Sequence, residues 1–177
     1  MEAELSSMKR RLILSFLFLI PLFYISMGHM MGAPLPAFLV GHENAISFAF
    51  TQLLLTLPIL YINDKYYKNG FRSLLHGGPN MDSLIAVGSA AAVVYGVFAI
   101  YQMGYGLGHG NLELVAQYHM DLYFESAGMI LTLITLGKFL ETRSKGKTSQ
   151  AISRLMDLAP KTATVLRDGA EAEIPVE

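Results

Sequence analysis

Four long apolar segments constrain the fold of this chain more than any other feature of its sequence. They cover residues 12–31, 45–62, 84–103 and 122–140, approximately. A helix needs about 20 predominantly apolar residues to cross the hydrocarbon core of a bilayer. Glycine and proline gather between the segments, as is typical of turns. The sequence therefore predicts an all-α transmembrane domain of four helices over residues 12–141, after a short amino-terminal segment, residues 1–11.

The composition supports this prediction and excludes other classes. Only 15 % of the residues are charged and 53 % are hydrophobic, whereas soluble domains carry about 25 % charged residues. The formal net charge is −1, so no bulk attraction to nucleic acid is expected. The chain contains no cysteine, which excludes disulfides and thiolate metal ligands within it. The first predicted partner is therefore a lipid bilayer.

The distribution of lysine and arginine predicts the orientation of the helices. The loops 32–44 and 104–121 contain neither residue. All 13 basic residues precede the first segment, separate the second from the third, or end and follow the fourth. Cytoplasmic loops carry an excess of these residues, so we expect a multi-pass protein of the plasma membrane with both termini cytoplasmic. A cleaved signal peptide over residues 9–31 is the alternative, but Met-Gly-His-Met is no small-residue cleavage site.

The sequence becomes polar after Arg143 and predicts a soluble segment over residues 142–177. Apolar residues at helical spacing predict a short helix that Pro160 ends: Ala151, Ile152, Leu155 and Leu158. An Asp-Gly turn between residues 163–166 and 173–176 predicts a β-hairpin. A lone hairpin is marginally stable in water, so we expect the sequence to stop within a larger, β-rich domain.

Two carboxylates stand at opposite ends of the fourth apolar segment. Glu125 and Glu141 are 16 positions apart, which is about 24 Å along a helix and places them on different faces. Ionisable groups within spans are costly and suggest a functional site. The alternative is that both side chains reach the membrane interfaces, Glu141 beside Arg143.

Methionine and histidine supply possible ligands for a soft metal ion such as Cu(I). One cluster follows the first segment and comprises Met27, His29, Met30 and Met31. His109, His119 and Met120 lie on the same predicted side. Met81 begins the third helix, where Asp82 is expected to be the N-cap. From the residues alone, ordinary packing in the core is the favoured explanation of Met81.

Two stretches together resemble a known family. PNMDSLIAVGSAAA and YFESAGMILTLITLGKFLETRSKGKTSQAISRLMDLAPKTATVLRDG closely resemble the membrane core of heavy-metal P-type ATPases, most specifically the copper-transporting ones. The resemblance implies that the first two helices are the leading pair of this class and that the next two begin the common core. It also implies that residues 142–177 form a linker helix and the incomplete start of the actuator domain.

The resemblance further implies an ATP-driven pump that exports Cu(I), its transported ion, from the cytosol. Met81 and Glu141 match the residues through which cytosolic copper enters, and Glu125 matches the glutamate that receives the ion on the exit path. The basic stretch after the second helix resembles a platform where a cytosolic copper chaperone, or the protein's own metal-binding domain, docks. Its basic residues are Lys65, Lys68 and Arg72.

The chain also departs from the family. The family often bends the second helix at a Gly-Gly pair, whose matching positions here are Ile62 and Asn63. The Cys-Pro-Cys, Asp-Lys-Thr-Gly and Thr-Gly-Glu-Ser sequences are absent, so we expect no ATP hydrolysis by these residues alone. ATP and Mg²⁺ would act only in a full-length protein with the remaining pump domains. The alternatives are a Zn(II) or Cd(II) pump of the same class and a stand-alone four-span metal-binding membrane protein.

Overall fold

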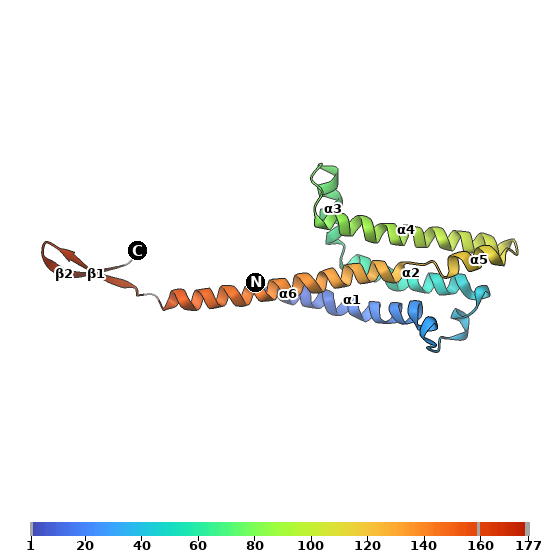
Figure 1. The fold of residues 1–177 in the computed structure, drawn as a ribbon, viewed down its shortest axis with the longest axis horizontal. Coiled ribbons are helices and arrows are strands. Elements are labelled where there is room, and N and C mark those ends of the chain that lie inside the picture. Colours follow the sequence, from blue (N-terminus) through green and yellow to red (C-terminus); the bar gives the residue numbers. More distant parts are fainter. Residues whose placement is uncertain (1, 159, 176–177) are drawn as a thin grey trace. The chain divides into compact units, whose positions relative to one another are not determined.

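The computed structural model describes residues 2–158 and 160–175. The described chain forms two compact units, residues 2–139 and the residues from Leu140 onward. Its long helices are α1 (Glu2–Gly28), α2 (Ala45–Ile62), α4 (Met81–Gly108) and α6 (Phe124–Asp157), coloured along the chain in Figure 1. Among the described residues, four helical segments are long and apolar enough to cross a membrane. The prediction of four such helices is confirmed.

Short elements connect the long helices. After α1 the chain forms the 3₁₀ turns η1 (His29–Met31), η2 (Ala37–Leu39) and η3 (His42–Asn44). The connections on either side of α4 hold α3 (Lys65–Leu75) and α5 (Leu112–His119). Loops 32–44 and 104–121 therefore meet at one end of the first unit, which we call the loop end. The α2–α3 connection and the start of α4 form the other end, which we call the basic end.

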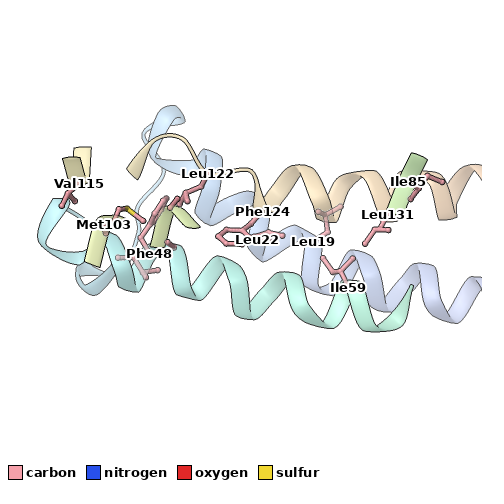
Figure 2. Packing of buried hydrophobic residues seen from close by; sticks show 14 of the residues in the cluster. Leu19, Leu22, Phe48, Ile59, Ile85, Met103, Val115, Leu122, Phe124 and Leu131 are labelled. Atoms are coloured by element: carbon pink, nitrogen blue, oxygen red, sulfur yellow. The ribbon is translucent and has the colours of Figure 1, made fainter. Parts of the chain in front are cut away.

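The core of the first unit lies where α6 packs between α1 and α2. A Cβ atom added at Gly128 of α6 would lie 3.1–3.3 Å from Leu22, Ile59 and Leu19. Glycine at this position lets the backbone of α6 approach both neighbours closely. Buried side chains fill the space around this contact (Figure 2): Leu19, Leu22, Ile59, Phe124 and Leu131.

Helix α4 contacts the start of α6 through a second glycine. A Cβ atom added at Gly96 would lie 2.3 Å from Cζ of Phe124, whose side chain is fully buried. The ring cannot move aside without disturbing the core around it, because protein interiors are close-packed. Gly96 therefore sets the distance between α4 and α6.

We expect Gly96→Ala to lower the stability of the bundle by about 1–3 kcal/mol, the usual cost of overpacking a core. Gly88→Ala is the matched control, because Gly88 is in the same helix and a Cβ there would meet nothing within 4 Å. The control is expected to be neutral or to stabilise by up to about 1 kcal/mol, since alanine is the better helix former. Thermal unfolding of both variants in one detergent measures the difference. Equal melting temperatures would contradict the close α4–α6 contact.

A buried side chain holds the bend between α2 and α3. Asn63 donates hydrogen bonds from its amide to Ser15 Oγ at 2.9 Å and to the carbonyl of Ile59 at 3.0 Å. Thr135 of α6 donates to Asn63 Oδ1 at 3.0 Å, and its Oγ1 lies 2.9 Å from the hydroxyl of Tyr66. The bend thus occurs at Asn63, and polar contacts to α1 and α6 fix it.

The start of α4 corrects one expectation. Asn80, not Asp82, is the N-cap: its Oδ1 accepts from the backbone N–H of Ser83 at 3.0 Å, and Ser83 Oγ accepts from the Asn80 N–H at 3.2 Å. Asn80 has the extended backbone of an N-cap, with φ −131° and ψ −171°. Asp82 already lies inside the helix, where its carboxylate pairs with Lys138 of α6 at 3.0 Å.

The second unit contains the end of α6 and a hairpin. Strand β1 (Thr162–Arg167) pairs antiparallel with β2 (Ala170–Pro175), and Thr162 lies opposite Pro175. The turn uses Asp168 at φ 54° and Gly169 at φ 79°, as the Asp-Gly sequence predicts. The second strand begins earlier than expected, at Ala170, and its predicted last residue, Val176, lies outside the described residues. The predicted helical residues up to Asp157 belong to α6.

Candidate metal site

A small cavity lies at the loop end of the first unit. Its volume is about 60 Å³, enough for an ion or a few water molecules. Five of the elements described above contribute to its lining: the end of α1, η1, the first half of α2, the end of α5 and the first turn of α6. Its polar and sulfur-bearing lining residues are Ser26, Met27, Met30, Gln52, His119, Met120 and Glu125.

Glu125 contributes a buried carboxylate, one oxygen of which has no hydrogen-bond partner among the described residues. The residue is only 5 % exposed, and no hydrogen-bond partner of its Oε2 is found among the described residues. Its position in the first turn of α6 favours negative charge, because the helix dipole is positive there. A buried carboxylate without a partner is costly, and a cation in the cavity would offset that cost.

Gln52, on α2, also lines the cavity, and both polar atoms of its side chain lack hydrogen-bond partners among the described residues. It is 1 % exposed, and within the described chain neither Oε1 nor Nε2 has a hydrogen-bond partner. Buried amides are nearly always hydrogen-bonded, so such an exception needs an explanation. Sequence reasoning missed this residue. The available signal was a single amide side chain inside the apolar run SFAFTQLLLTLPIL.

The cavity is also lined by the thioether groups of three methionines and by the imidazole of His119. Met27 is half-buried at the end of α1, whereas Met30 and Met120 are exposed towards the mouth. Thioether sulfur and imidazole nitrogen are ligands that suit soft ions such as Cu(I). The donor set of the cavity therefore fits a soft monovalent cation, held at its base by the charge of Glu125.

A histidine pair joins the two loops beside the cavity. Nδ1 of His42, in η3, lies 3.0 Å from Nδ1 of His119, at the end of α5. The ring of His119 also packs edge-on against Phe48 of α2, with centroids 5.0 Å apart. The two histidines are 77 positions apart, so no local sequence pattern could have paired them.

The other methionine and histidine candidates at this end do not line the cavity. Met31 is exposed and is not among the lining residues. The side chain of His29 lies outside the part of the chain that the structure describes. Of the cluster predicted after the first helix, the structure brings Met27 and Met30 to Glu125.

Met81 and Glu141 fall in different units, so each is described by itself. Met81 is the first residue of α4 and is 61 % exposed. Glu141 carries an ion pair with Lys145 at 2.7 Å, one turn further along α6. A joint role for the two residues at the point where copper enters stays a prediction.

The predicted docking residues share one exposed face of α3. Lys65, Lys68 and Arg72 are exposed, while Tyr66 and Gly70 on the opposite face are buried. Lys68 bonds to Asp64 at 2.9 Å, and this hydrogen bond raises the pKa of Lys68. Figure 1 shows α3 turned away from the axis of α4. The surface is amphipathic and basic, and its docking role stays a prediction.

Comparison with known proteins gives a consistent picture. No family model matches the sequence. The chain is 37 % identical over 180 residues to the probable copper-importing P-type ATPase A of Enterococcus hirae, covering 99 % of this chain and 22 % of that protein. It is 34 % identical over 177 residues to a copper-exporting P-type ATPase of Staphylococcus epidermidis, covering 99 % and 20 %. With the copper-exporting P-type ATPase of Bacillus subtilis it shares 36 % identity over 155 residues, covering 81 % and 18 %. The chain thus spans about a fifth of the length of these relatives.

Proposed function

Because this chain belongs to the copper-transporting P-type ATPases, we propose that it is the amino-terminal membrane part of an ATP-driven Cu(I) pump. The observation that carries the proposal is the cavity at the loop end, where Glu125 meets Met27, Met30, Met120 and His119. These donors suit the ion named in the descriptions of the relatives. ATP hydrolysis and Mg²⁺ binding belong to domains beyond these residues.

Within this proposal, Cu(I) moves from the basic end to the loop end. Met81 and Glu141 receive cytosolic copper, and Glu125 receives it before release. The excess of lysine and arginine at the basic end supports a cytoplasmic location for that end. The relatives include pumps named for import and for export, so export is carried over from the family resemblance alone.

The exposed face of α3 supplies the docking platform in this proposal. Lys65, Lys68 and Arg72 offer positive charge to a cytosolic copper chaperone or to the protein's own metal-binding domain. Charge complementarity of this kind accelerates encounter and orients partners more than it adds affinity.

The alternative metals are not favoured. Zn(II) sites in proteins use thiolate, imidazole and carboxylate ligands in tetrahedral arrangements. The cavity instead offers three thioethers with a single carboxylate and a single imidazole, and the matched relatives quoted above are named for copper.

An immunoblot of the native host with an antibody against residues 144–177 tests whether these residues belong to a pump. A band several times heavier than the 19.5 kDa of this sequence is expected. A band near that mass would contradict the pump proposal and would favour a stand-alone four-span metal-binding protein.

We expect Met81→Ala and Glu141→Gln, each made in the complete pump, to lower copper-stimulated ATP turnover without removing the protein from the membrane. Each change removes one ligand from the proposed point of copper binding. Met156→Ala is the matched control, since Met156 is an exposed methionine on α6 with no proposed role. Unchanged copper dependence of ATP hydrolysis in Met81→Ala would remove Met81 from that site.

A further inference from the structure

A second cavity lies at the basic end of the first unit, between the start of α1 and the α2–α3 bend. Its volume is about 320 Å³. Ser7, Met8 and Arg11 line it from α1, and Ile62 and Lys65 line it from the bend. Apart from Lys65, none of these residues has a role in the copper path described above.

One nitrogen of the Arg11 guanidinium is buried without a hydrogen-bond acceptor among the described residues. Its Nη1 is shielded from solvent, and no hydrogen-bond acceptor for it is found among the described residues. A buried donor left without an acceptor costs about 1–3 kcal/mol, and more when it is charged. An acceptor group that enters the cavity would remove this cost.

Lys65 adds a second positive charge that neighbouring acids do not neutralise fully. Burial lowers the pKa of Lys65, and the nearby charges of Arg11 and Lys138 lower it further. Two acids close by are already engaged, Asp82 with Lys138 at 3.0 Å and Asp64 with Lys68 at 2.9 Å. Glu4 and Asp64 both line the cavity. The charge of Asp64 is paired with Lys68, whereas Glu4 forms no ion pair within the described chain. The cavity therefore suits an anion, with Glu4 as its competitor.

The surroundings of the cavity favour a lipid as the source of that anion. The outer face of α1 beyond Arg11 exposes Ile13, Leu17 and Ile20, which a bilayer would cover. Arg11 lies inside α1 just before its apolar part, and Lys65 begins α3 three residues after the end of α2, so both border apolar segments where phospholipid headgroups lie. Basic pockets between transmembrane helices at this depth bind anionic headgroups.

We propose that this cavity binds the phosphate of an anionic phospholipid headgroup. Arg11 and Lys65 donate hydrogen bonds to the phosphate oxygens, for which the planar guanidinium is well shaped. The Ser7 hydroxyl is a third donor within the lining. The lipid then fastens the start of α1 to the α2–α3 bend. The proposal does not depend on the copper function.

The test is native mass spectrometry of the 1–177 chain released from detergent with phosphatidylglycerol, phosphatidylcholine or inorganic phosphate. Phosphatidylglycerol is expected to remain bound to the unaltered chain. Arg11→Gln is expected to weaken this binding at least about tenfold, the effect of losing a charge-assisted hydrogen bond. Arg10→Gln is the matched control, because it removes the same charge from an adjacent, exposed residue. Physiological ionic strength limits the influence of surface charge to about 8 Å.

A second variant gives a change of opposite sign. Glu4→Gln removes the competing carboxylate and is expected to strengthen phosphatidylglycerol binding severalfold, so a folding defect in Arg11→Gln cannot account for both results. Equal losses in Arg10→Gln and Arg11→Gln would overturn the proposal in favour of general surface attraction. Equal retention of phosphatidylcholine would exclude selectivity for an anion. Inorganic phosphate that binds as tightly as the lipid would identify a free anion as the ligand.

Discussion

Glu125→Gln in the 1–177 chain is expected to weaken the binding of Ag(I), a redox-stable substitute for Cu(I), by about 3 kcal/mol or more, which exceeds a hundredfold. The carboxylate is buried at the base of the cavity and lacks a hydrogen-bond partner at Oε2 within the described chain. Without the negative charge of Glu125, a bound Ag(I) ion would lose its hydration shell and gain no anion to compensate for that loss. Isothermal titration calorimetry in detergent measures the loss.

The matched control is Glu113→Gln, which removes the same charge from an exposed position at the loop end. It is expected to leave Ag(I) affinity nearly unchanged, since Glu113 does not line the cavity. If the two variants bind Ag(I) equally well, Glu125 is not a ligand and the proposed exit path loses its acceptor.

Gln52→Leu separates binding from stability at the same site. Replacing an unpartnered buried amide by an apolar side chain of similar size is nearly neutral or stabilising for the fold. Ag(I) affinity is expected to fall in this variant while the melting temperature stays the same or rises. A fall in melting temperature with unchanged affinity would mean that Gln52 serves the fold alone.

Asn63→Ala is expected to lower the stability of the first unit by about 2–4 kcal/mol, because it removes a fully buried side chain and leaves polar partners unsatisfied. The amide of Asn63 links Ser15 of α1 to Thr135 of α6. The single hydroxyl proton of Thr135 is shared between Asn63 Oδ1 at 3.0 Å and the carbonyl of Leu131 at 2.7 Å, so the hydroxyl of Tyr66 must donate to Thr135. Thermal unfolding in detergent measures the loss, and Asn69→Ala, at an exposed position of α3, is the matched control.

Asn63→Gly distinguishes side-chain contacts from backbone freedom at this bend. Asn63 has φ −106°, a conformation that ordinary residues adopt without strain. Glycine is therefore expected to be as destabilising as alanine here. Wild-type stability in Asn63→Gly would show that flexibility of the backbone, and not the hydrogen bonds, maintains the bend.

Local patterns in the sequence predicted most of the helical architecture. The second helix was expected over residues 45–62 and has those bounds, because proline, glycine and polar residues flank an unbroken apolar run. The other long helices are longer than expected, since hydropathy detects the part within the bilayer and polar residues continue α1 at its start and α6 at its end; only α4 extends at both ends. Helix α1, for example, begins at Glu2.

What the sequence could not predict depends on contacts between distant residues. The N-cap of α4 required knowing which residue precedes the first helical turn, and Asn80 occupies that place ahead of Asp82. In the sequence Gln52 is a single amide within an apolar run. Only the packing of α1, α5 and α6 around it shows that it lines a cavity. The Asn63–Thr135 bond joins residues 72 positions apart, beyond the reach of any helical periodicity.

That last bond has a consequence for the biosynthesis of the chain. The first two helices can enter the membrane as a hairpin soon after they leave the ribosome. The hydrogen bond at Asn63 Oδ1, however, cannot form until Thr135 has been synthesised. Contacts between distant residues form late, because the intervening chain must first be ordered. Helix α3 is held against α4 through Gly70 and Tyr67, but the hydrogen bonds that link the α2–α3 bend to α6 form only once the fourth helix has arrived. An incompletely translated chain would therefore lack part of the contacts that hold the proposed docking face.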